Sequence, residues 1–190
     1  MNELNPKNYL AELIKEWGYP DQFVKYKTYA ADESTFVSQV HLPFNNGLEP
    51  RATGTAPRKK DAEKAAAAAL FAVIKKDFPQ LLIDWQEIFI EAQAGDALVK
   101  LAAYVSPQLN TPEKKSNWLQ LHETDLRFET IFDELYNRRD PRVSFFGKNL
   151  GKKRKATFIE ALIWRTYQKM LIGEKQREIL AAIFSFKAFE

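Results

Sequence analysis

The sequence contains no cysteine and only two histidines among its 190 residues. Without cysteine there is no disulfide, no thiolate nucleophile and no cysteine-ligated metal centre. Two histidines, His41 and His122, argue against a histidine-built metal site and against a hydrolase triad. No run of 18 apolar residues is present, so we expect no membrane span. Together these absences favour a cytoplasmic protein.

The chain does contain enough apolar material for a folded core, with 45% hydrophobic and 13% aromatic residues. Its net charge of +3 is unevenly distributed along the chain. Residues 1–78 carry a net charge of +1, residues 79–136 carry −6 and residues 137–190 carry +8. A carboxylate-rich middle segment followed by a basic one argues against charge spread evenly over one sphere. We expect two domains, at residues 1–78 and 79–190.

The first domain is predicted to fold in the order helix, three strands, helix. Asn5 followed by Pro6 is typical of an N-cap with proline at the first helical position. Segments rich in aromatic and β-branched residues then predict strands at residues 23–29, 36–42 and, more weakly, 49–55. Pro57 opens a second helix over residues 58–76, which contains a run of alanines.

The second domain shows no strand pattern, and its apolar spacing predicts an all-α fold. We expect helices at residues 84–105, 125–136, 156–171 and 174–186. Proline and polar residues between 107 and 117 predict a loop. The predicted fold class is therefore α+β, with an α-β-β-β-α domain followed by an all-helical domain.

Several residues of the first half follow a known family pattern. They are Pro6, Leu10, Glu12 and Leu13 in the first helix, Tyr26, Phe36 and Val40 in the strands, and Gly54–Glu63 with Ala65–Ala69 in the second helix. Over residues 5–76 this pattern resembles the double-stranded-RNA-binding domain family. The resemblance implies binding of A-form RNA by its shape and backbone, across two minor grooves and the phosphates between them.

The start of the second helix gives a physical reason for contact with RNA. Arg58, Lys59 and Lys60 stand where free backbone N–H groups and the helix dipole already favour an anion. We expect these three residues to contact phosphates. Asn8 and Glu12, on the exposed face of the first helix, are expected to meet 2′-hydroxyls in one minor groove.

The loop between the first two strands departs from the family pattern. The family usually has Gly-Pro-x-His there, and the corresponding residues Tyr29–Asp32 contain neither proline nor histidine. Ser34 or Thr35 can still donate a hydrogen bond, whereas Asp32 and Glu33 place negative charge near phosphate. We therefore expect weaker binding than a complete motif gives, or additional contacts from the second half.

A basic run supplies a second surface for such contacts. Residues 138–155 contain eight cationic side chains and one acid. Such a run is often only a solvated face, but beside an RNA-binding domain it favours contact with the duplex. The expected contact residues are Lys152, Lys153 and Arg154. Phe145 and Phe146, in the same run, are expected to be buried rather than to stack on bases.

Two stretches of the second half follow the pattern of a nuclease family. Ala94–Leu98 contains Gly-Asp-Ala, and Ala156–Ile163 contains Glu-Ala-Leu-Ile. They resemble helices of the ribonuclease III family, and more closely its compact mini-ribonuclease III branch. The resemblance implies an all-helical homodimer in which Asp96 and Glu160 are catalytic and hold Mg²⁺, which activates a water.

Three functions stay open at this point. The favoured one is a double-stranded-RNA-binding protein whose helical half is a degenerate nuclease or an interaction module, because the acid set is small. The alternative is a Mg²⁺-dependent endoribonuclease acting on structured RNA. The third is a regulator that uses its helical half only to dimerise. The partner in each case is double-stranded or structured RNA.

Overall fold

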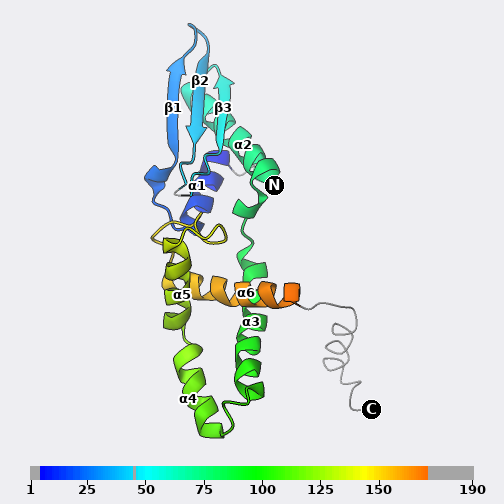
Figure 1. Ribbon diagram of the computed structural model, residues 1–190. Coiled ribbons are helices and arrows are strands. Elements are labelled where there is room, and N and C mark those ends of the chain that lie inside the picture. Colours follow the sequence, from blue (N-terminus) through cyan, green and yellow to red (C-terminus); the bar gives the residue numbers. More distant parts are fainter. Residues whose placement is uncertain (1–4, 45, 171–190) are drawn as a thin grey trace, which may run out of the picture. The chain divides into compact units, whose positions relative to one another are not determined.

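The computed structural model describes residues 5–44 and 46–170 of the chain. Within them the protein is α+β, with one three-stranded antiparallel sheet and six α-helices (Figure 1). The described residues form two compact units. Unit 1 holds the residues up to Asp84 together with Thr130–Lys155, and unit 2 holds Trp85–Glu129 together with the residues from Ala156 onward.

Unit 1 contains the predicted helix, three strands and helix, in that order. These elements and two short 3-10 turns are α1 (Pro6–Glu16), η1 (Asp21–Phe23), β1 (Lys25–Ala30), β2 (Phe36–His41), β3 (Arg51–Ala56), α2 (Lys59–Asp77) and η2 (Pro79–Leu81). The predicted N-cap is confirmed, because the Asn5 side chain accepts a hydrogen bond from the Lys7 N–H at 3.1 Å. Strand bounds differ from the predicted ones by at most two residues.

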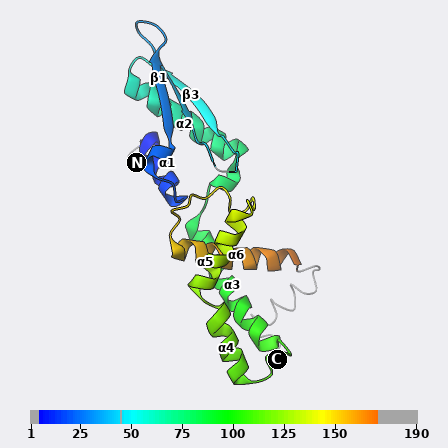
Figure 2. The ribbon, with the colours of Figure 1, turned by 60° about the vertical axis from the view of Figure 1, so that its left-hand side comes forward.

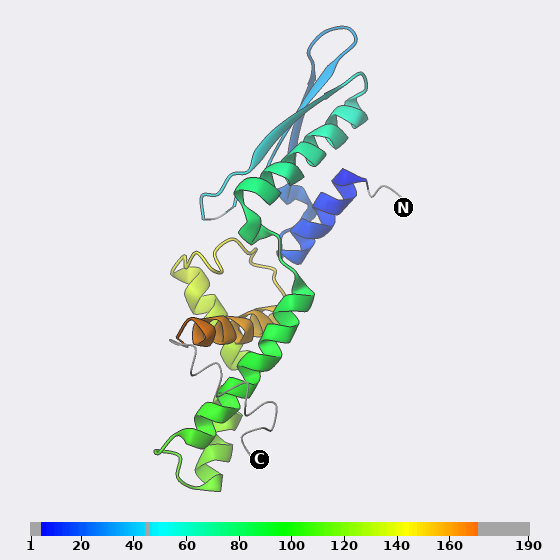
Figure 3. The same ribbon diagram turned by 90° about the vertical axis from the view of Figure 1, so that its right-hand side faces the viewer.

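Helix α2 lies along one face of the sheet, and its alanines make that close approach possible (Figure 3). A Cβ at Gly54 of β3 would lie only 2.1 Å from the backbone nitrogen of Ala66. No side chain fits between the strand and the helix at this point. Helix α1 packs against α2, with the rings of Tyr9 and Phe71 in edge contact at 5.0 Å.

The chain returns to unit 1 after it has formed part of unit 2. The N–H of Gly147 donates to the carbonyl of Trp17 at 2.7 Å, and that of Asn149 donates to the carbonyl of Gly18 at 3.2 Å. Gly18 has φ +82°, a conformation suited to glycine, and a Cβ there would meet the Leu150 backbone at 2.4 Å. The division therefore differs from the predicted boundary at residue 78, because residues 130–155 pack with the first domain. Phe146 is fully buried in this segment, and Phe145 nearly so.

Unit 2 has helices and no strand in its described residues. It contains α3 (Trp85–Val105), α4 (Pro112–His122), the start of α5 (Asp125–Asn137) and most of α6 (Lys152–Met170). Helices α3 and α4 run in opposite directions beside one another (Figure 2), and α6 crosses α3 (Figures 1 and 3). None of the helices in the described residues has the length and apolarity needed to cross a lipid bilayer.

The loop predicted between residues 107 and 117 is wrong over much of its length, because α4 begins there. Pro112 occupies the first turn of α4, and the Thr111 hydroxyl accepts a hydrogen bond from the Lys114 N–H at 3.3 Å. A capping threonine followed by proline starts a helix as readily as it marks a loop. The helix predicted at residues 174–186 lies outside the described residues.

Candidate functional site

All nine residues that the sequence predicts to contact RNA belong to unit 1 and are exposed: Asn8, Glu12, Ser34, Arg58, Lys59, Lys60, Lys152, Lys153 and Arg154. They come from four places: α1, the loop between β1 and β2, the start of α2 and the start of α6. We call the first three places together the α1–loop–α2 surface.

The start of α2 is cationic and has no side-chain cap. Arg58 is the N-cap residue, with extended backbone angles of φ −121° and ψ 140°, and its side chain accepts no capping bond. The first N–H groups of α2 are therefore available to an anion. Within the described residues, no ion pair or hydrogen bond holds the head groups of Arg58, Lys59 or Lys60.

The strand register places the β1–β2 loop at the same end of the sheet as the start of α2. Ala30 pairs with Phe36, and Phe36 in turn pairs with Ala56, so all three lie in one row. The loop at residues 31–35 leaves the sheet from this row, and α2 begins at Lys59, three residues after Ala56. The two predicted RNA-contacting segments are thus neighbours in space.

Asp32 organises this loop. Its Oδ1 accepts hydrogen bonds from the backbone N–H of Ser34 at 2.8 Å and from the Ser34 hydroxyl at 2.9 Å. These bonds hold the pKa of Asp32 below its usual value. Asp32, whose negative charge is unfavourable near phosphate, therefore has a structural role in the loop. The Ser34 hydroxyl already has an intramolecular acceptor.

An ion pair fixes α1 on α2. The ammonium of Lys7 lies 2.5 Å from a carboxylate oxygen of Glu63 and 4.9 Å from the centre of the Tyr26 ring. The hydrogen bond from Lys7 is the main cause that lowers the pKa of Glu63. The exposed residues Asn8 and Glu12 are four apart on α1 and share one helical face. The Lys7–Glu63 ion pair thus sets the orientation of that face relative to the start of α2.

The predicted basic surface lies at the other end of α1. Lys152, Lys153 and Arg154 form the first turn of α6, and the Arg154 Nη1 donates to the carbonyl of Glu16 at 3.1 Å. Unit 1 therefore presents two helix starts rich in cations, one on α2 and one on α6. Each combines side-chain charge with the positive end of a helix dipole.

In unit 2 the structure brings together the two predicted metal ligands, Asp96 on α3 and Glu160 on α6. A Cβ at Gly95 would lie 1.9 Å from the carbonyl oxygen of Glu160, so the two helices touch at backbone level. Burial raises the pKa of Glu160 to about 7, and the negative charge of Asp96 adds to this effect.

A lysine compensates part of this negative charge. The Lys100 ammonium lies 2.8 Å from Asp96 and 3.0 Å from Glu123, and these hydrogen bonds raise the pKa of the lysine. Lys100 was not among the predicted site residues, although its position four residues after Asp96 on a helix predicts such a pair.

The donor set for a magnesium ion is small. Within the described residues, no group of three or more His, Asp or Glu side chains is placed to hold a metal. Glu91, the next acid on α3, pairs with Arg165 at 2.6 Å. Mg²⁺ is often held by one or two carboxylates when substrate phosphates complete its coordination. Asp96 and Glu160 therefore fit an ion shared with a substrate phosphate, but not one held by the protein alone.

Another pair was missed among the basic residues. Lys155 belongs to the run of cations that the sequence predicts to form a surface, yet its side chain is only 11% exposed and its ammonium lies 2.7 Å from Asp133. Its helical spacing to the buried residues Phe158 and Ile159 could have revealed that it faces inward.

Comparisons of the chain with protein-family models, with curated proteins and with solved structures found no match.

Proposed function

We propose that unit 1 binds double-stranded RNA through the α1–loop–α2 surface. The observation that carries the proposal is the exposed cationic triplet Arg58–Lys60 at the uncapped start of α2, beside the β1–β2 loop. A-form RNA presents phosphates along the edges of a deep, narrow groove that side chains cannot read. A cationic helix start can bind those phosphates without reading bases.

The other parts of the surface suit the flanking minor grooves. Minor-groove edges of RNA display 2′-hydroxyls, which both donate and accept hydrogen bonds. Asn8 offers an amide and Glu12 a carboxylate, so both can bond to hydroxyl groups. The recognition proposed is of duplex shape and backbone, with the first turn of α6 adding phosphate contacts.

The test compares two ends of one helix. Lys59→Ala with Lys60→Ala removes two cations from the start of α2, and Lys75→Ala with Lys76→Ala removes two exposed cations from its last turn. The first double variant should bind duplexes of any sequence more weakly, and the slope of log affinity against log salt should shrink by about 2. The second should bind like the unchanged protein. Equal effects of the two double variants would refute the proposed surface.

For unit 2 we propose a non-catalytic helical module, because Asp96 is already paired with Lys100. The second candidate is Mg²⁺-dependent cleavage of structured RNA, which the proximity of Asp96 and Glu160 favours. Labelled duplex RNA incubated with Mg²⁺ separates the two. Cleavage that disappears in Asp96→Asn and Glu160→Gln, with binding retained, would establish the nuclease. Intact RNA in all three proteins supports the non-catalytic module.

Two of the candidate functions predict a homodimer: the nuclease, and a regulator that uses its helical half to dimerise. The mass of the full chain in solution, measured by light scattering across protein concentrations, distinguishes these from a monomeric RNA-binding protein.

A further inference from the structure

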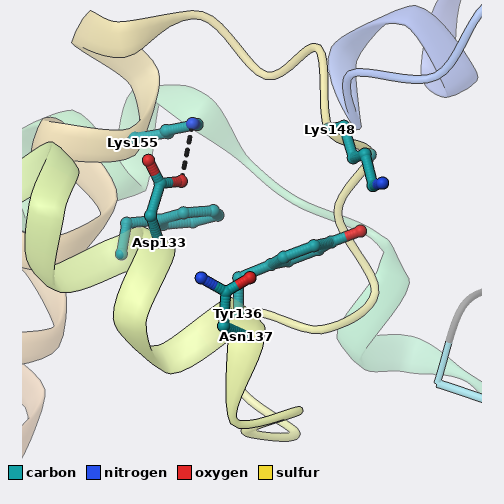
Figure 4. Close-up of a pocket in the computed structure, with 7 residues that line it drawn as sticks. Asp133, Tyr136, Asn137, Lys148 and Lys155 are labelled. Atoms are coloured by element: carbon teal, nitrogen blue, oxygen red, sulfur yellow. Dashed lines mark hydrogen bonds and ion pairs between the residues drawn. The ribbon is translucent and has the colours of Figure 1, made fainter.

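Unit 1 contains a pocket of about 290 Å³ that the proposed duplex contacts do not use. Its walls come from α5, from the segment before α6 and from the first turn of α6. The lining residues are Phe132, Asp133, Tyr136, Asn137, Gly147, Lys148 and Lys155 (Figure 4). A volume near 300 Å³ is at the small end of the range for small-molecule sites.

The segment that closes the pocket is held by backbone hydrogen bonds. The N–H of Gly147 donates to Trp17, and a Cβ at Gly147 would lie 2.2 Å from the carbonyl oxygen of Gly18. This anchoring holds Lys148 at the rim, where its side chain is exposed. The pocket is therefore built by the fold and does not depend on a loose loop.

The lining of the pocket, its rim included, has a net positive charge. Lys155 is buried and pairs with Asp133 at 2.7 Å, and its ammonium lies 5.7 Å from the centre of the Phe132 ring. This pair is neutral overall, so Lys148 leaves the lining with a net charge of +1. Figure 4 shows Lys148 across the pocket from the Asp133–Lys155 pair, with the ring of Tyr136 between them. An anionic group is therefore favoured on the Lys148 side.

The remaining walls suit a flat, polar-edged ring. The rings of Phe132 and Tyr136 lie within 12° of parallel, and Tyr136 is only half buried. Asn137 offers both a donor and an acceptor, and Asp133 offers carboxylate oxygens. Unstacked bases bind proteins in this way, by stacking on an aromatic side chain and bonding through their edges.

We propose that this pocket binds a single nucleotide. The base lies against Tyr136, the edge of the base bonds to Asn137 and Asp133, and the phosphate meets Lys148. Inorganic phosphate alone would contact neither the Tyr136 ring nor the Asn137 amide. The ligand is either a free nucleoside monophosphate or an unpaired nucleotide of an RNA. The site reads a base, whereas the proposed duplex surface reads the backbone.

The test uses the full chain and isothermal titration calorimetry. The probes are the four nucleoside 5′-monophosphates, the matching nucleosides and inorganic phosphate. At least one monophosphate should bind more tightly than its nucleoside and than phosphate. Lys148→Ala should weaken that binding about tenfold, which corresponds to one charge-assisted contact. Asn137→Ala, a second exposed substitution, should also weaken it, and Lys76→Ala should not.

Three results would overturn the proposal: no binding of any monophosphate, equal binding of inorganic phosphate, or unchanged binding in both Lys148→Ala and Asn137→Ala. A duplex with a one-nucleotide bulge then identifies the source of the ligand. If the bulged duplex binds more tightly than the perfect one, and the monophosphate abolishes this difference by competition, the ligand is an unpaired nucleotide of RNA. If the two duplexes bind equally, the ligand is the free nucleotide. Lys59→Ala with Lys60→Ala should leave monophosphate binding intact, so this site and the duplex surface fail independently.

Discussion

The contact between Gly95 and Glu160 makes a sharp prediction about unit 2. In an exposed helix, replacing glycine by alanine stabilises the helix by about 1 kcal/mol. At position 95 the added Cβ would lie 1.9 Å from the carbonyl oxygen of Glu160 and 2.7 Å from its carbonyl carbon. Both distances are shorter than real Cβ contacts, and both atoms belong to backbone that cannot rotate away.

The size of the effect follows from this geometry. To reach an ordinary contact, α3 and α6 must separate by about 1 Å or more, and overpacking of this kind typically costs 1–3 kcal/mol. A contact of 1.9 Å with backbone places the cost in the upper part of this range, above the gain in helix propensity, so we expect Gly95→Ala to destabilise unit 2. A matched control is Ala97→Gly, at an exposed position of the same helix, which should cost only about 1 kcal/mol through propensity.

The assay is thermal unfolding followed by circular dichroism, combined with hydrogen exchange of the α3 and α6 amides. Gly95→Ala should lower the unfolding midpoint despite its higher helix propensity, and the extra exchange should appear in both helices, whereas that of Ala97→Gly should stay within α3. A midpoint equal to or above that of the unchanged protein would show that the helices do not touch at backbone level. It would also remove the structural reason for the proximity of Asp96 and Glu160.

Three further predictions concern unit 1. Glu63→Gln should destabilise the protein at pH 7, because Lys7 lowers the folded-state pKa of Glu63; the difference should begin to shrink as the pH falls below about 4.5 and vanish once the pH is below that lowered folded-state pKa. Denaturant titrations at several pH values measure this, and a pH-independent difference would contradict it. Asp32→Asn keeps the loop's accepting oxygen but removes its charge, so at low salt it should bind duplex RNA a few times more tightly than the unchanged protein does, and this gain should shrink at high salt. Equal affinity at 50 mM salt would place the loop away from phosphate. Trp17→Phe leaves the buried carbonyl of Leu81 without its 2.9 Å hydrogen bond and should cost about 1–3 kcal/mol by guanidinium denaturation. A cost near zero would mean that water replaces the indole.

Local signals predicted most of the elements in this protein. The Asn5–Pro6 start of α1, the strand-forming segments and the alanines of α2 all act through neighbours close in sequence, and their elements are where they were expected. The prediction of an α+β fold is confirmed for the same reason. The loop predicted around Pro112 is wrong because a proline after a capping residue is compatible with either a loop or the start of a helix. Only the packing of α4 on α3 selects the helix.

Long-range contacts explain what the sequence could not reveal. The return of residues 130–155 to unit 1 depends on backbone N–H groups, such as that of Gly147, and backbone bonds leave no mark in side-chain pattern. Lys155 belonged to a run of cations, and charge alone could not distinguish the buried one from its exposed neighbours. For the candidate sites, the exposure of Arg58–Lys60 and the proximity of Asp96 to Glu160 agree with expectation, whereas the ion pair of Lys100 required coordinates.

The discontinuous path of unit 1 has a consequence for synthesis on the ribosome. Its last stretch ends at Lys155, roughly 70 residues after Asp84 has emerged. At about 5–20 residues per second, the amino-terminal portion waits on the order of 4 to 14 seconds for that stretch. During this interval the carbonyls of Trp17 and Gly18 lack their N–H donors Gly147 and Asn149. The residues of the sheet and its two helices are therefore synthesised before those that form the wall of the proposed nucleotide pocket.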